Sequence, residues 1–148
     1  MLWPSAMEGA GMTRSRFVRT VWWVLILIFL IVGVWAFFSP RSFYRAFATY
    51  PPFNKHLLRD IGAFNFGLGV ALLAALRFRD GLLVALTGSA AAGVAHGLSH
   101  IIDSDAGGRS SDPIVYSVLA VIVVAAAIQR SKEIKARHWM RGSGFGKG

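Results

Sequence analysis

The feature that most constrains the fold is the run TVWWVLILIFLIVGVWAFF, nineteen residues from Thr20 to Phe38 without a charge. At about 1.5 Å per residue, a helix of this length crosses a hydrocarbon core of about 30 Å. A backbone in lipid has to satisfy its own hydrogen bonds, so a helix is the expected structure. Three arginines precede the run, as in a signal peptide. However, the run is longer than a typical signal h-region and WAFFSP offers no small-residue cleavage site, which indicates an uncleaved span.

Three more apolar runs predict further spans at residues 57–78, 82–102 and 113–129. The short turn RFRDG separates the second run from the third, which predicts a tight antiparallel hairpin. Pro113 suits the first turn of the fourth helix, with Ser111 or Asp112 as its N-cap. The sequence therefore predicts an all-α fold, a four-helix transmembrane bundle over residues 20–129. A cytoplasmic N-terminal segment (1–19) and a basic cytoplasmic tail (130–148) flank it.

The charges orient this bundle. The net charge is +9, and the sixteen Lys and Arg residues lie beside the spans, which favours membrane electrostatics over nucleic-acid binding. The N-terminal segment, the RFRDG turn and the tail carry eleven of them, against five on the other side. The positive-inside rule then places both termini in the cytoplasm, and the tail is expected to attract anionic lipid.

Composition adds three expectations. Arginine and alanine are abundant, which is typical of a bacterium with a GC-rich genome, so the membrane would be a bacterial plasma membrane. The chain has no cysteine, which excludes disulfides and thiolate metal sites. Translation starts at Met1 or at Met12, since MTRSRFVRT is a conventional lead-in to a first span.

The first outer loop, residues 39–60, is long and aromatic. Residues 41–50 predict a short interfacial helix, with Phe43, Tyr44 and Phe47 facing the bilayer. Two prolines then end it, and Asn54 is placed to cap the second span. Such a helix either closes the bundle or gates a ligand.

Polar residues gather at the outer ends of spans two and three. At 100° per residue, His96, His100 and Asp103 share one stripe of the third span. At the outer start of the second span lie His56, Arg59 and Asp60, which we expect to meet the histidines if the two faces point together. Asn65 lies one turn deeper than Asp60 and well round the helix.

Three interpretations of this polar cluster stay open. The residues form a hydrogen-bonded brace that holds the hairpin together. Alternatively, His96 and His100 bind a metal or haem, with Asp60 or His56 as a third ligand or an orienting partner. In the third interpretation, the cluster handles protons or a substrate.

No enzyme motif accompanies the cluster. The sequence contains no H-E-x-x-H, phosphate loop, nucleophile elbow or dinucleotide fingerprint. The leading hypothesis is a non-enzymatic membrane protein or accessory subunit, acting with a membrane partner or as a homo-oligomer. A membrane redox, metal or haem protein comes second. A small oligomeric transporter comes third, because one bundle of this size leaves little room for a pathway.

Around NKHLLRDIGAFNFGLGV and AAGVAHGLSHIIDSD, the chain resembles a group of small actinobacterial four-helix membrane proteins of DoxX-like architecture. In that group a segment similar to Y-N-E-H-L-x-R-D-x-G-A opens the second span, and a histidine-rich segment closes the third. The matching residues are Asn54, His56, Leu57, Arg59, Asp60, Gly62, Ala63, His96 and His100. Lys55 stands where the group often has glutamate. The resemblance extends from about Phe43 to Leu119, and it implies a four-helix integral membrane fold without specifying an activity.

Overall fold

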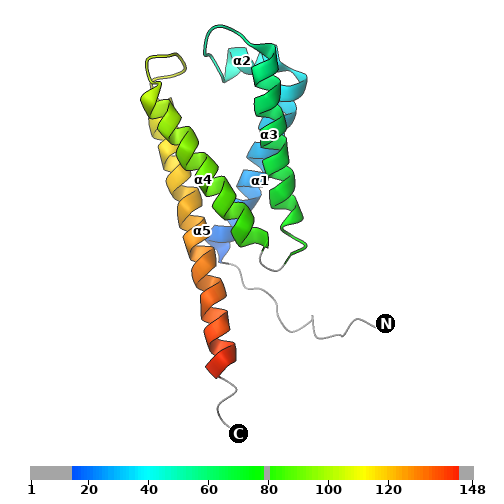
Figure 1. Ribbon diagram of the computed structural model, residues 1–148, viewed down its shortest axis with the longest axis vertical. Helices are drawn as coiled ribbons and strands as arrows, with labels where there is room; N and C mark the ends of the chain where they lie inside the picture. The colour runs from blue at the N-terminus through cyan, green and yellow to red at the C-terminus, as the bar shows by residue number, and fades with distance from the viewer. Residues whose placement is uncertain (1–14, 79–80, 144–148) are drawn as a thin grey trace, which may run out of the picture.

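The computed structural model describes residues 15–78 and 81–143, and within them the chain is helical with no strand (Figure 1). The two candidate starts, Met1 and Met12, lie outside the described residues. The described helices are α1 (Arg16–Phe38), α2 (Pro40–Ala46), α3 (Lys55–Ala74), α4 (Gly81–Ile102) and α5 (Asp112–Ser143). The predicted all-α fold is confirmed.

Four of the described helices are long and apolar enough to cross a membrane: α1, α3, α4 and the Asp112–Arg137 part of α5. Only 22% to 28% of the apolar window of each helix is buried inside the molecule. Most of the apolar surface therefore faces outward, which is compatible with contact to a lipid bilayer.

The four long helices form two pairs, α1 with α3 and α4 with α5 (Figure 1). The two pairs share a core near the α3–α4 turn, which we call the turn end. There Trp22 of α1 is buried and donates its indole N–H to the carbonyl of Leu72 at 2.9 Å. Leu82 and Leu86 of α4 and Ala126 of α5 also belong to this core. Toward the opposite end, which we call the α2 end, the ribbons of α3 and α4 diverge (Figure 1).

Contact between α1 and α3 depends on glycine. A Cβ added to Gly62 of α3 would lie 2.6 Å from the backbone nitrogen of Phe37 and 2.9 Å from the carbonyl oxygen of Gly33. Both distances are shorter than a carbon can tolerate, so the two backbones approach each other only because Gly62 has no side chain. Small residues allow this close packing in membrane helices generally.

The short helix α2 lies within the predicted region, but it ends at Ala46 instead of continuing to residue 50, and one of the predicted side-chain orientations is wrong. Phe43 does not face the bilayer: it is 4% exposed and packs with Ala36 of α1 and Leu58 of α3. Its ring meets Trp35 edge-on at 5.4 Å. The reason is that α2 folds back over the ends of α1 and α3, which offer more apolar contact. Phe47 is exposed.

The start of α3 agrees with the prediction, whereas the end of α5 does not. Asn54 caps α3 as predicted, since its side-chain oxygen accepts hydrogen bonds from the backbone N–H groups of His56 and Leu57. The fourth span was predicted to end at residue 129, but α5 continues as one helix to Ser143. Residues 130–143 of the predicted tail therefore extend the helix beyond the turn end.

An ion pair at the turn end ties α5 to the start of α1. Arg130 is 1% exposed, and its guanidinium donates to the carboxylate of Glu133 at 3.0 Å. The other oxygen of Glu133 accepts the backbone N–H of Ser15 at 2.9 Å. Residues of the predicted basic tail thus contribute to the packing of the bundle.

Candidate functional site

Four ring side chains from three segments meet at the α2 end of the molecule. His96 and His100 lie one turn apart on α4, Tyr116 lies on α5, and Tyr50 lies in the loop between α2 and α3. We call these four residues the His/Tyr cluster. It brings together both pairs of helices at the end where α3 and α4 are farthest apart (Figure 1).

His100 is the centre of the cluster. It is 8% exposed, and its Nδ1 atom lies 2.8 Å from the hydroxyl oxygen of Tyr50. Its ring stacks on Tyr116 with centroids 4.2 Å apart and an interplanar angle of 18°. A buried imidazole requires a hydrogen-bond partner, and the Tyr50 hydroxyl supplies it. In the tautomer with its proton on Nε2, His100 accepts this hydrogen bond from Tyr50.

His96 occupies the exposed side of the same cluster. Its ring meets His100 edge-on at 4.7 Å and Tyr116 at 4.6 Å. Both histidines point along one stripe because residues four apart share a helix face. His96 and His100 thus lie on the same face of α4, as predicted, and this face packs against α5.

Two loops hold Tyr50 in this position. Arg109, in the loop between α4 and α5, donates to the carbonyl of Ala46 at 2.6 Å. Gly108 donates its backbone N–H to the carbonyl of Thr49 at 3.4 Å. Gly108 has a φ of +80°, and a Cβ there would lie 2.5 Å from the Tyr50 hydroxyl. Glycine is therefore required both for the backbone conformation and for the close approach of Tyr50.

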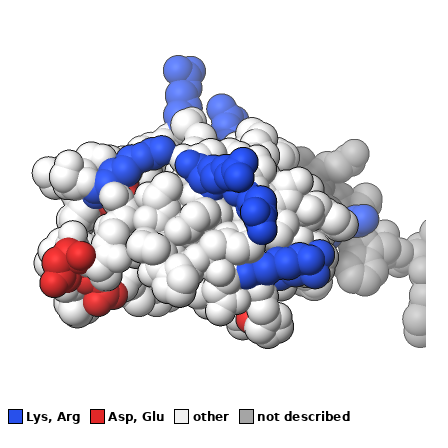
Figure 2. Space-filling model, turned by 90° about the horizontal axis from the view of Figure 1, so that it is seen from above, with Lys and Arg blue, Asp and Glu red and all other residues white. Residues whose placement is uncertain are grey.

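Acidic groups border the cluster. Asp112 starts α5 and accepts the backbone N–H of Arg109 at 2.9 Å, and Asp103 follows the last turn of α4. Seen from the α2 end, acidic side chains gather on the side of α4 and α5, while basic ones spread over the rest of this face (Figure 2). Partial burial, followed by the charges of Asp112 and Asp103, raises the pKa of Tyr50 above its usual value. The phenol therefore keeps its proton, and can donate it in a hydrogen bond, over the whole neutral range.

The other predicted polar residues lie elsewhere. His56 and Asp60 face each other on α3 with Nε2 and Oδ2 3.5 Å apart, and Arg59 donates to the carbonyl of Phe37 at 3.4 Å. Asn65 donates to the carbonyl of Ile61, one turn back on its own helix. In the described part of the chain, no hydrogen bond, ion pair or ring contact joins these residues to the His/Tyr cluster. The structure separates the two groups because α3 and α4 diverge toward this end.

A metal site requires several donors at one point. Within residues 15–78 and 81–143, no group of three or more His, Cys, Asp or Glu side chains could hold a metal ion. The two residues that sequence reasoning missed are Tyr50 and Tyr116. Each resembles an ordinary aromatic residue of a membrane interface, so the sequence carries no signal that marks it as a partner of His100.

Comparisons with protein-family models, with curated proteins and with solved structures return no match for this chain.

Proposed function

We propose that this chain is a multi-pass membrane protein without catalysis of its own, an accessory subunit in a bacterial plasma membrane with both termini in the cytoplasm. In this proposal the His/Tyr cluster is a structural brace. It fixes the outward-facing loops, and a membrane partner or a second copy recognises the bundle they close.

The single observation that carries the proposal is the 2.8 Å contact between Tyr50 and the buried imidazole of His100. An imidazole whose Nδ1 bonds to a tyrosine and whose ring stacks on Tyr116 has the environment of a packing residue. A histidine that relays protons or binds a ligand needs an open face, and His100 offers little.

A metal- or haem-binding protein is the second candidate, and one observation favours it. His96 is exposed and its ring lies 4.7 Å from that of His100, so two imidazoles adjoin each other at the membrane boundary. Because Nδ1 of His100 is hydrogen-bonded to Tyr50, only its Nε2 atom would be available to bind a metal. Two such ligands would need others from a partner or from the cofactor itself.

Support for the orientation comes from the charge distribution. Eleven of the sixteen basic residues belong to the N-terminal segment, the RFRDG turn and the tail. The test is a topology reporter fused after Gly148 and a second one inserted at Ala106. The proposal predicts a cytoplasmic signal from the first fusion and an external signal from the second. An external signal from the Gly148 fusion would overturn the orientation.

Membership of the group of small actinobacterial membrane proteins is also a proposal. It rests on the residues around His56 and His100 that match that group's pattern. Among these, Asn54 has a structural reason for its identity, because it caps α3. Asn54→Ala should therefore lower the free energy of unfolding.

A further inference from the structure

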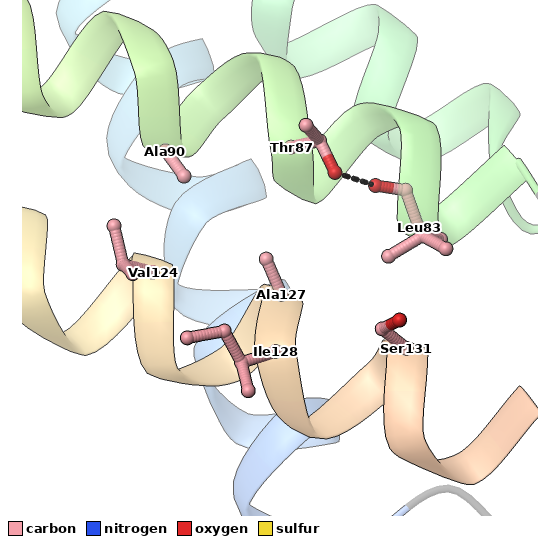
Figure 3. A pocket seen from close by; sticks show the side chains of 7 residues that line it. All are labelled: Leu83, Thr87, Ala90, Val124, Ala127, Ile128 and Ser131. Carbon is pink, nitrogen blue, oxygen red and sulfur yellow. Dashed lines mark hydrogen bonds between the residues drawn. The ribbon is translucent and has the colours of Figure 1, made fainter. Parts of the chain in front are cut away.

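A shallow groove runs between α4 and α5 in the half of the bundle nearest the turn end (Figure 3). Its volume is about 380 Å³, which lies within the range of small-ligand sites, about 300–1,000 Å³. Its walls are mostly apolar and come from Leu83, Ala90, Val124 and Ile128. Helix α1 lies behind the groove in this view, so the groove opens away from the core (Figure 3).

Two hydroxyl groups line the same groove, and they differ in their bonding. Thr87 donates to the carbonyl of Leu83 at 2.8 Å, so its hydroxyl proton is already used (Figure 3). Ser131 lies at the tail-side end of the groove, and its hydroxyl makes no hydrogen bond within the described residues. A ligand in the groove would therefore meet hydrocarbon along most of its length and one available hydroxyl at the end.

Positive charge follows directly beyond that end. On α5, Val124, Ile128, Ser131 and Lys135 lie within about 60° of one another at 100° per residue, so Lys135 continues the stripe that lines the groove. It is exposed, as is Lys132. One turn of helix, about 6 Å, separates Ser131 from Lys135. The neighbouring acid, Glu133, is engaged with Arg130 and the N–H of Ser15, so it does not cancel this charge.

We infer that this groove binds one anionic phospholipid, with an acyl chain between α4 and α5 and the phosphate at Lys132 and Lys135. The apolar part of the groove lies along the first ten residues of α4, about 15 Å, which is half of a hydrocarbon core. An acyl chain of the adjacent leaflet reaches this depth, and its headgroup then lies beyond the start of α4, at the turn end, where the lysines are. Basic residues just beyond a span attract anionic headgroups in general. Here the groove adds a defined binding site for the acyl chain. The inference rests on the proposed membrane location of the chain.

Native mass spectrometry of the full chain, purified in detergent and titrated with lipid, tests the inference. Phosphatidylglycerol and phosphatidylcholine with identical acyl chains are the two probes. We expect one phosphatidylglycerol to bind saturably and phosphatidylcholine to bind much more weakly. Neutralising Lys132 or Lys135 by Lys→Gln should weaken phosphatidylglycerol binding about fivefold for each lysine. Both side chains are exposed, so the fold should survive these changes.

A second variant probes the groove itself. Thr87→Phe places a ring in the groove and should abolish the bound lipid. The control is Ala92→Phe, an exposed position about 140° round the same helix. Lys55→Gln, at the α2 end, is the control for charge. Both control variants should bind as the wild type does.

Several outcomes would overturn the inference. The inference fails if both lipids bind equally, if the two Lys→Gln changes leave binding unaffected, or if Thr87→Phe binds fully. Each of these results would show that the bound lipid is ordinary bulk lipid and not lipid held in a specific site. Recovery of the chain in the soluble fraction of cells would defeat the proposed membrane location and this inference together. Recovery in membranes without selective lipid binding would defeat the lipid site alone.

Discussion

The hydroxyl of Tyr50 lies 2.8 Å from Nδ1 of His100, and this contact joins the loop after α2 to the last turn of α4. The loop that holds Tyr50 leads into α3 of one helix pair, whereas α4 belongs to the other pair, and the two pairs share their core near the turn end. Hydrogen bonds from Arg109 to Ala46 and from Gly108 to Thr49 join the same two segments. Losing the Tyr50 contact should therefore loosen the α2 ends of the pairs while leaving the core around Trp22 intact.

Tyr50→Phe tests the strength of this contact. The variant keeps the ring and removes the hydroxyl, which leaves Nδ1 of a buried imidazole without its partner. We expect the free energy of unfolding to fall by about 1–3 kcal/mol, measured by reversible denaturation in detergent micelles. Tyr44→Phe is the matched control, because the Tyr44 ring packs edge-on against Phe53 and its hydroxyl makes no hydrogen bond in the described part of the chain. Equal losses in both variants would contradict the brace.

The two histidines should differ in their importance. His96→Gln should cost no more than about 1 kcal/mol, because the exposed ring of His96 only contacts the rings of His100 and Tyr116. His100→Gln should cost about 1 kcal/mol more, because it removes a buried ring and also disturbs the hydrogen bond to the Tyr50 hydroxyl. The same denaturation measurement compares them, and a larger cost at His96 would contradict the assignment of His100 as the centre.

A chelator separates the brace from the metal alternative on the same variants. With a structural cluster, the thermal midpoint of the wild type should be identical with and without chelator. If the wild type loses stability on chelation and the two Gln variants do not respond, the histidines bind metal and the brace account fails.

Glycine at the α1–α3 contact gives a sharper test of the fold. Gly62→Ala forces a Cβ to within 2.6 Å of the Phe37 backbone, so the helices have to separate. We expect a loss of about 1–3 kcal/mol, typical of overpacking, in the free energy of unfolding. Gly67→Ala on the same helix is the control, since a Cβ there meets nothing within 4 Å. Replacement of glycine by alanine in that exposed helix position should be neutral or slightly stabilising.

The pH dependence of the brace follows from Tyr50. The pKa of Tyr50 is raised above its usual value of about 10, first by partial burial and then by Asp112 and Asp103. A raised folded-state pKa means that the stability contribution is fully present below about pH 10 and is lost as the pH rises through the folded pKa. The stability difference between the wild type and Tyr50→Phe should stay constant from about pH 7 to pH 9 and shrink at higher pH. In tyrosinate absorbance, Tyr50→Phe should remove one tyrosine from the late part of the titration.

The span pattern was predictable because hydropathy and length report directly on lipid-exposed helices. Thr20–Phe38 has no other stable structure in a bilayer, and the Asn54 cap follows from a local rule that needs no tertiary information. The shared face of His96 and His100 likewise follows from helix periodicity.

The features that the sequence did not predict depend on the angles between the packed helices. The separation of His56 and Asp60 from His100 follows from the divergence of α3 and α4, and the composition of a hairpin does not determine that angle. Likewise, the burial of Phe43 depends on α2 folding back toward the ends of α1 and α3. The sequence places Arg130 in the basic tail, because counting charges does not reveal that Arg130 is buried and paired with Glu133.

The most direct test of the brace is a distance between the two helix pairs at the α2 end. The chain has no cysteine, so spin labels can be attached at Phe64→Cys on α3 and Ile101→Cys on α4, both of which are exposed. Double electron–electron resonance in lipid nanodiscs should give a narrow distance distribution in the otherwise wild-type chain. Adding Tyr50→Phe should broaden it toward longer distances, while adding Tyr44→Phe should leave it unchanged. A distribution that stays equally narrow with Tyr50→Phe would contradict the claim that Tyr50 and His100 hold the two pairs together.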